Sequence, residues 1–199
     1  MLMGVGDRIG TVSQQTTSAA DPQLQFFENF PGHVGAGNLA YSNGTLSVHA
    51  VNIPLSISFN NVVMLMSVSS AALSNFSGTL QFGLYSLTGS TLSLANSASA
   101  ANLIITTAYS WISMVTSATQ NISPGAWYFA ANLFTGVGDH TSVSLYANSS
   151  INPVNAIPGG FLMGRMTAST NAMPASIATS ALDITGSDAG RHPLIIITA

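Results

Sequence analysis

No Asp, Glu, Lys or Arg occurs between Glu28 and Asp139 of this chain. Over its full 199 residues the chain is 5% charged, whereas about a quarter of the residues of an ordinary globular domain are charged. Charged side chains keep an exposed surface hydrated and keep neighbouring molecules apart. A chain without them is therefore expected either inside a membrane or packed against further copies and partners.

The apolar segments are too short and too interrupted for a membrane-spanning helix, which needs about 20 apolar residues. The most apolar window, residues 100–118, is broken by polar side chains, among them Asn102, Thr106, Thr107, Ser110 and Ser113. The densest apolar runs, residues 62–66 and 194–197, have the length of strands. Residues 1–4 carry no cationic segment before an apolar stretch, so we expect no signal peptide and no membrane partner.

Few residues are available for nucleic-acid binding or for thiol chemistry. The only cations are Arg8, Arg165 and Arg191, and phosphate binding normally needs several clustered cations. The chain has no cysteine, which excludes disulfides, thiolate nucleophiles and cysteine-based metal sites. We therefore expect no nucleic-acid partner.

From residue 41 onward, apolar residues recur with a period of two, which is typical of strands. Leu46, Val48 and Ala50, for example, alternate with polar residues. Turn signals stand between such segments, at Asn43-Gly44, Thr88-Gly89 and Pro124-Gly125. The pattern predicts about ten short strands, near residues 45–50, 55–59, 62–68, 80–85, 91–94, 109–115, 127–134, 141–147, 161–166 and 194–198.

This spacing predicts an all-β, antiparallel β-sandwich of the jelly-roll type over residues 41–199. Residues 148–160 and 167–192 are expected to be long loops. The predicted outward faces carry Ser and Thr where many sheet proteins carry charge, so we expect much of this surface to be covered. The alternative is that the hydroxyl faces are simply hydrated.

Residues 1–40 differ from the rest, because they hold four charged residues and show no clear period. We expect them to form an extended N-terminal arm. Its candidate interface anchors, which would bind a neighbouring subunit, are Leu24, Phe26, Phe27 and Phe30. The alternative is that these apolar residues cap the core of their own chain.

The titratable residues do not form a recognisable catalytic or metal-binding motif. The four histidines, His33, His49, His140 and His192, are scattered and lack zinc-ligand spacing. His49 falls on the polar side of a predicted strand and is expected at the surface. Asp139-His140 is the most site-like dipeptide, but its glycine-rich surroundings favour a hairpin loop.

The remaining candidates are also better explained by structure than by chemistry. Asp183 and Asp188 flank a glycine and are expected to be turn residues paired with Arg165 or Arg191. They supply too few oxygens for a calcium loop. We therefore predict no catalytic residue, no metal site and no cofactor, and we expect that the protein is not an enzyme.

Aromatic residues offer a further possibility, since Trp111, Trp127 and Tyr128 could stack on sugars. They lie in the middle of predicted strands, so we expect them in the core. In the first of these strands the alternation places Tyr109, Trp111 and Val115 on the side opposite Ile112 and Met114.

Three segments resemble blocks of the virion proteins of tailed bacteriophages. Residues 80–94, LQFGLYSLTGSTLSL, resemble a GLY-(T/S)-x-x-GSTLSL block. Residues 122–130 are similar to a strand with the pattern L-x-PG-x-YW, and residues 184–197 are similar to a closing DI-x-G-S…R-x-P strand. The resemblance covers residues 41–199 loosely and brings no catalytic residues with it.

The resemblance implies a jelly-roll-like sandwich, often trimeric, that is made in the host bacterial cytoplasm and assembled on a virion. It favours a capsid decoration (cement) protein that forms a homotrimer and contacts the major capsid protein or other virion proteins. The alternative is a tail-fibre or head-fibre module that recognises a glycan or protein on the host surface. A carbohydrate hydrolase is the third alternative.

Overall fold

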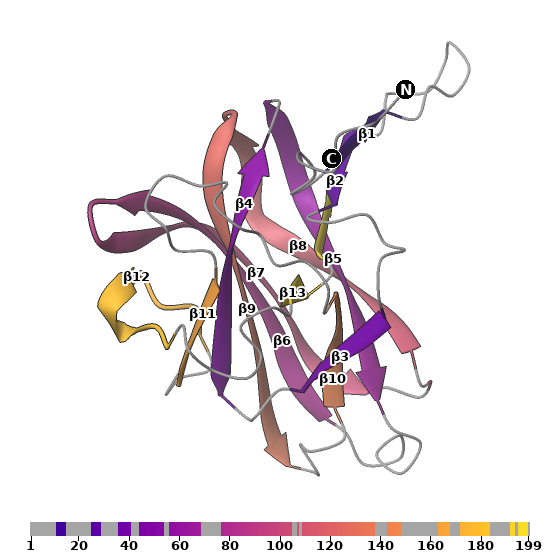
Figure 1. The fold of residues 1–199 in the computed structure, drawn as a ribbon. Helices are drawn as coiled ribbons and strands as arrows, with labels where there is room; N and C mark the ends of the chain where they lie inside the picture. Colours follow the sequence, from indigo (N-terminus) through magenta and orange to yellow (C-terminus); the bar gives the residue numbers. More distant parts are fainter. Residues whose placement is uncertain are drawn as a thin grey trace, which may run out of the picture.

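The structure is a computed structural model, and it describes residues 11–14, 25–28, 36–40, 44–53, 56–68, 77–104, 107, 109–137, 143–148, 163–167, 172–183, 192–193 and 195–198. These residues form an all-β, antiparallel and strongly curled sheet, a half-barrel of eight or nine strands (Figure 1). Short strands at its edges complete the architecture.

The strands, in chain order, are β1 (Thr11–Gln14), β2 (Gln25–Glu28), β3 (Ala36–Ala40), β4 (Thr45–Ile53), β5 (Ile57–Val68), β6 (Ser77–Thr88), β7 (Thr91–Ile104), β8 (Tyr109–Ile122), β9 (Gly125–Val137), β10 (Val143–Asn148), β11 (Met163–Thr167), β12 (Ser176–Ala178), β13 (His192–Pro193) and β14 (Ile195–Thr198). A 3-10 turn, η2 (Thr179–Ala181), follows β12.

Strands β5 to β9 are 12 to 14 residues long, so the prediction of short strands was wrong for this part of the chain. The predicted strands at residues 55–59 and 62–68 join in one strand, β5, which begins at Ile57. A bulge between Phe59 and Asn61 absorbs the interruption in the apolar pattern. The predicted turn at Thr88-Gly89 is confirmed, because Gly89 has a φ of 60° in the two-residue connection of β6 and β7.

The strand pairs are nested around the β6–β7 hairpin. β6 pairs with β7, β5 with β8, β4 with β9 and β3 with β10, all antiparallel. Two lateral pairs, β5 with β10 and β6 with β9, then assemble the strands into two sets. The orders are β3-β10-β5-β8 and β4-β9-β6-β7. β11 pairs with β4 at the edge of the second set. β14 pairs with residues 61–64 of β5, whereas β10 pairs with residues 66–68 of that strand.

The main apolar core lies between these two sets, and both contribute to it. Met64 comes from β5 of the first set and Ile197 from β14 beside it, and Leu80, Phe82 and Phe129 come from the second set. The rings of Phe82 and Phe129 pack edge to face with their centroids 5.3 Å apart. The burial of apolar side chains from both sets of strands therefore stabilises the curled sheet.

A second apolar cluster covers the opposite face of β4, β9 and β6. Tyr85 and Tyr128 belong to it, together with Ile177 and Leu182 from the segment 172–183. This segment includes β12, which pairs with the start of β7. The prediction of a loop was therefore wrong for these residues, because their apolar side chains cover the sheet.

Burial on both faces also corrects the prediction for His49. Its side chain is 1% exposed, and its ring stands edge to face with Phe129 at a centroid distance of 5.9 Å. The sequence pattern placed His49 on the polar side of its strand. The expectation of surface exposure was wrong because that side faces the interior of the half-barrel.

Among the described residues, the two sets meet at a single ladder pair, Ala98 of β7 opposite Thr116 of β8. We call this junction the seam. The Thr116 hydroxyl lies 2.7 Å from the carbonyl oxygen of Ala118 and 3.1 Å from that of Asn60, both as acceptors. A side chain thus replaces missing ladder hydrogen bonds where the sheet turns sharply.

Asn96 provides the second connection across the seam. Its Nδ2 donates to the carbonyl oxygen of Ala118 at 3.1 Å. Its Oδ1 accepts from the backbone N–H of Ser97 at 2.7 Å and from the hydroxyl of Ser117 at 3.1 Å. Asn96 is 6% exposed, so these polar groups have little access to water.

We predict that Asn96→Ala lowers the free energy of unfolding by about 2 kcal/mol, because buried polar groups lose their partner. Asn121→Ala, at an exposed position of the same strand pair, is the matched control and should stay within about 0.5 kcal/mol of the parent. Urea denaturation of both variants checks the prediction. Equal midpoints for the two variants would show that the seam does not depend on Asn96.

Candidate functional site

The outer side of β8 exposes three large apolar side chains. Tyr109 is 60% exposed, Trp111 is 55% exposed and Val115 is 74% exposed. The intervening residues point the other way, since Met114 is buried in the main core and Ile112 packs against it. The predicted alternation of this strand is therefore confirmed.

Neighbouring strands continue the same apolar surface. Leu65 of β5 lies opposite Trp111, and Val63 lies opposite both Ser113 of β8 and Ile196 of β14. These aliphatic side chains are half-buried. We call this surface the β8 face, defined by Val63, Leu65, Tyr109, Trp111, Val115 and Ile196.

A row of neutral hydrogen bonds crosses the β8 face. The Ser113 hydroxyl donates to Oδ1 of Asn61 at 2.8 Å, and Nδ2 of Asn61 lies 3.4 Å from the hydroxyl oxygen of Thr198. These contacts join β8, β5 and β14 through side chains as well as through the backbone. No described side chain on these three strands carries a charge. At the edge, the register of β2 places Glu28 opposite Ile196.

A contiguous apolar surface of this kind marks an interaction site more often than a scattered one does. Isolated exposed apolar residues are common on soluble proteins. Here, however, aromatic and aliphatic side chains lie next to one another on three strands, with hydroxyl and amide groups between them. The β8 face is therefore the candidate functional surface of this chain.

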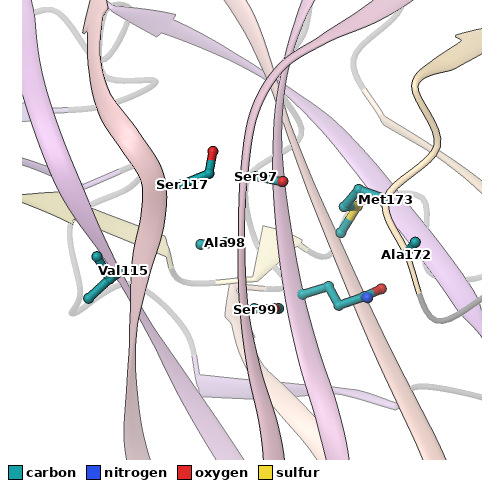
Figure 2. A pocket seen from close by; sticks show the side chains of 8 residues that line it. Ser97, Ala98, Ser99, Val115, Ser117, Ala172 and Met173 are labelled. Atoms are coloured by element: carbon teal, nitrogen blue, oxygen red, sulfur yellow. The ribbon is translucent and has the colours of Figure 1, made fainter.

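A pocket of about 400 Å³ opens at the seam and adjoins the β8 face. Figure 2 shows Ser97, Ala98 and Ser99 of β7 in its centre, with Val115 and Ser117 of β8 on one side and Ala172 and Met173 on the other. Gln81 of β6 completes the described lining. We call this the seam pocket. Val115 belongs to both the seam pocket and the β8 face, so the two are continuous.

The Met173 wall of the pocket is held by Tyr85 and Gly83. The Tyr85 hydroxyl donates to the carbonyl oxygen of Pro174 at 2.8 Å and lies 3.9 Å from the sulfur of Met173. A Cβ on Gly83 would lie 2.6 Å from the Tyr85 ring and 3.2 Å from that sulfur. Gly83 therefore permits the close packing that fixes this wall.

Gln81 and Asn132 form a neutral pair beneath the pocket. Nδ2 of Asn132 donates to Oε1 of Gln81 at 2.9 Å, and both residues are buried. The described lining thus combines apolar groups with hydroxyls and an amide, and it contains no charged side chain.

The titratable side chains near the seam pocket with a shifted pKa are tyrosines that pack as neutral groups. Burial raises the pKa of the Tyr85 hydroxyl and also that of Tyr128, so both remain neutral at physiological pH. Within the described part of the chain, no group of three or more His, Cys, Asp or Glu side chains is placed to hold a metal ion. No described helix is long and apolar enough to cross a membrane.

The predicted aromatic candidates have three different outcomes. Tyr128 is buried, as expected, and Trp127 packs half-buried against the core while its Nε1 donates to the carbonyl oxygen of Ser123 at 2.9 Å. Trp111 was expected in the core and is exposed, so that prediction was wrong. Because both sides of β8 are apolar in the sequence, the pattern could not decide which side faces outward.

The predicted arm anchors fall partly within the described chain. Phe26 and Phe27 lie in β2, whose backbone pairs with β14. Leu24 and Phe30 lie outside the described residues. β3, also within the first 40 residues, pairs with β10. Figure 1 shows β1 and β2 extending away from the curled sheet at one corner.

Of the polar candidates, Asp183 and Arg165 are neighbours in the structure. Their backbones exchange two hydrogen bonds, with N–O distances of 3.0 Å and 2.7 Å. The Asp139-His140 dipeptide, His33 and Asp188 lie outside the described residues. No pattern in the sequence indicated the seam pocket, because its lining comes from three strands and the segment 172–183.

No protein-family model matches this chain, and no curated protein matches it. Its function is therefore inferred from the β8 face and the seam pocket themselves.

We predict that Tyr85→Phe lowers the free energy of unfolding at neutral pH by about 1 kcal/mol, because the Pro174 carbonyl loses its donor. The variant should also change the alkaline stability profile. Because burial raises the pKa of Tyr85, the unfolded chain loses this proton first, above about pH 10. The contribution of the neutral Tyr85 hydroxyl to the free energy of unfolding is therefore complete below about pH 10 and declines as the pH rises further.

Urea denaturation of parent and variant between pH 7 and pH 11 tests both statements. The parent should lose stability more steeply than Tyr85→Phe above about pH 10. Parallel pH profiles would contradict the assignment of a buried, neutral Tyr85 hydroxyl.

Proposed function

We propose that this chain is a structural protein of a tailed-bacteriophage virion and that it acts as a capsid decoration (cement) protein. The observation that carries the proposal is the β8 face, where exposed aromatic and aliphatic groups lie on strands without a described charge. A face of this kind is stabilised when companion subunits cover it. The absence of charged residues between Glu28 and Asp139 supports the same conclusion.

The strand order supports a jelly roll as the finer description of the fold. Nested pairs from β3–β10 inward to β6–β7, with lateral pairs that give two sets of four strands, agree with the pairing expected of a double-sheet jelly roll. Viral capsid proteins and lectins use this architecture. We therefore propose a jelly-roll domain over residues 41–199, to which β3 adds the first strand.

The proposed mechanism is the addition of buried area between subunits of the head. Apolar surface contributes roughly 25 cal/mol per Å² when it leaves water. A few hundred Å² per contact then gives several kcal/mol, before the costs of association and ordering are subtracted. Repetition over a homotrimer and over many sites on the major capsid protein would strengthen the shell.

The N-terminal arm, residues 1–40, is the proposed connection to neighbouring subunits. Its anchors are Leu24, Phe26, Phe27 and Phe30. The hairpin-like pair of β1 and β2 lies at the edge of the sheet, beyond β14, with β1 outermost. This position supports the role, because an edge segment can reach a second molecule.

A receptor-binding module of a tail or head fibre is the second candidate. The seam pocket favours it, because neutral hydroxyl and amide groups can bind a host glycan or protein segment. Electron microscopy of virions with a labelled antibody separates the two candidates. Label on the head supports decoration, and label on the tail supports the fibre.

We predict that removal of residues 1–30 releases the protein from heads, because the arm anchors are lost. A point variant, Phe26→Ser with Phe27→Ser, should reduce occupancy in the same direction. Occupancy is measured by quantitative gel analysis of purified heads, after circular dichroism has shown that the variants retain their strands. A matched control is Ser58→Ala, at an exposed position on β5. Unchanged occupancy in folded arm variants would refute the role of the arm.

A further inference from the structure

We propose that the seam pocket receives the Trp111 ring of a second copy of this chain, so that two copies pair through a two-fold contact along β8. This inference rests on the proposed burial of the β8 face by companion subunits, and it names one of those companions. The inference assigns a binding partner to the seam pocket, namely a second copy of this chain. It also assigns the class of group that the pocket binds, an aromatic side chain with a single hydrogen-bond donor.

The pocket walls suit a flat apolar ring. Val115 and Ala98 provide aliphatic surface, and Met173 provides a thioether. Thioether sulfur makes favourable contacts with aromatic rings. Because Tyr85 and Gly83 fix the position of Met173, this wall is in place before a ring enters.

The polar groups of the pocket suit a ligand with one hydrogen-bond donor. The Ser117 hydroxyl donates its proton to Oδ1 of Asn96, so it offers acceptor lone pairs to the pocket. Ser97 and Ser99 place further hydroxyl oxygens in the lining. An indole carries one N–H donor and no acceptor, and a buried indole normally finds a partner for that N–H.

Other occupants match this lining less well. The described lining contains no charge for an ionic ligand and no aromatic ring on which a sugar could stack. Oε1 of Gln81 already accepts a hydrogen bond from Asn132. A sugar would have the serine hydroxyls as partners but no ring to stack on, whereas an indole needs only one acceptor and packs against the apolar walls.

The chain itself presents such a ring beside the pocket. Trp111 is 55% exposed on β8, and Tyr109 is 60% exposed two residues earlier. Covering these rings removes apolar surface from water. No described side chain of the β8 face or of the pocket lining is charged, so two copies can approach without like-charge repulsion.

The spacing along β8 favours a two-fold arrangement. Trp111 and Val115 lie on one side of the strand, four residues apart, which corresponds to about 13 Å. A two-fold axis near Ser113, midway between them, places the Trp111 ring of each copy at the Val115 side of the other copy's pocket. Both contacts then form together, as an isologous interface requires.

The test uses the purified full-length chain and sedimentation equilibrium over a range of concentrations. Trp111→Ser should remove the two-fold contact and so lower the assembly mass below that of the parent, and Ser99→Met, which fills the pocket, should do the same. Ser93→Met, the same substitution at an exposed position of β7 outside the described lining, is the matched control and should keep the parental mass. Equal masses for the parent and for folded Trp111→Ser would overturn the inference.

Mixing the two defective variants tests the pairing directly. Trp111→Ser keeps an intact pocket, and Ser99→Met keeps an intact ring, so each mixed pair can form one of the two contacts. The mixture should associate more strongly than either variant alone. A mixture no heavier than its components would also overturn the inference.

A spectroscopic readout covers the case in which a pocket variant is unstable. The chain has two tryptophans, so Trp127→Phe leaves Trp111 as the sole indole. Its emission should shift to shorter wavelength, and its quenching by acrylamide should fall, as the protein concentration rises. Emission and quenching that do not change with concentration would contradict the proposed contact. Neither result depends on head occupancy, so this inference and the virion role can fail separately.

Discussion

The β8 face must be stabilised without ionic groups, and the interpretation of this molecule depends on that constraint. Its polar groups are hydroxyls and amides that hydrogen-bond to one another, as Ser113 and Asn61 do. They hold the strands together and offer little repulsion to an approaching surface. Trp111 and Tyr109 remain exposed beside them. A surface of this composition is more stable when it is covered than when it is hydrated.

The seam connects this surface to the rest of the fold. Because the ladder between β7 and β8 is reduced to one described pair, the sheet can turn from one set of strands to the other. Asn96 and Thr116 supply side-chain hydrogen bonds at the turn. The same separation of strands opens the seam pocket next to Val115. The curvature that encloses the core and the hollow on the outer surface therefore have a common origin.

Much of the sheet was predictable from period-two alternation and from glycine turns, as β4, β6 and the Gly89 turn illustrate. The lengths of β5 and β7 were not, because a bulge at Phe59 and buried polar residues such as Asn96 interrupt the apolar pattern. Exposure was the least predictable property. His49 and Trp111 were both misplaced, since a strand that is covered on both sides, or apolar on both sides, gives no indication of which side meets water.

Hydroxyl-radical footprinting of the β8 face, on the free protein and on assembled virions, tests most directly whether companions cover this surface. The expected result is strong oxidation of Trp111 and Tyr109 in dilute free protein and several-fold protection of both rings after assembly. Met114, buried in the core, should be protected in both states. Equal oxidation of the two rings in the free and assembled states would contradict the central claim.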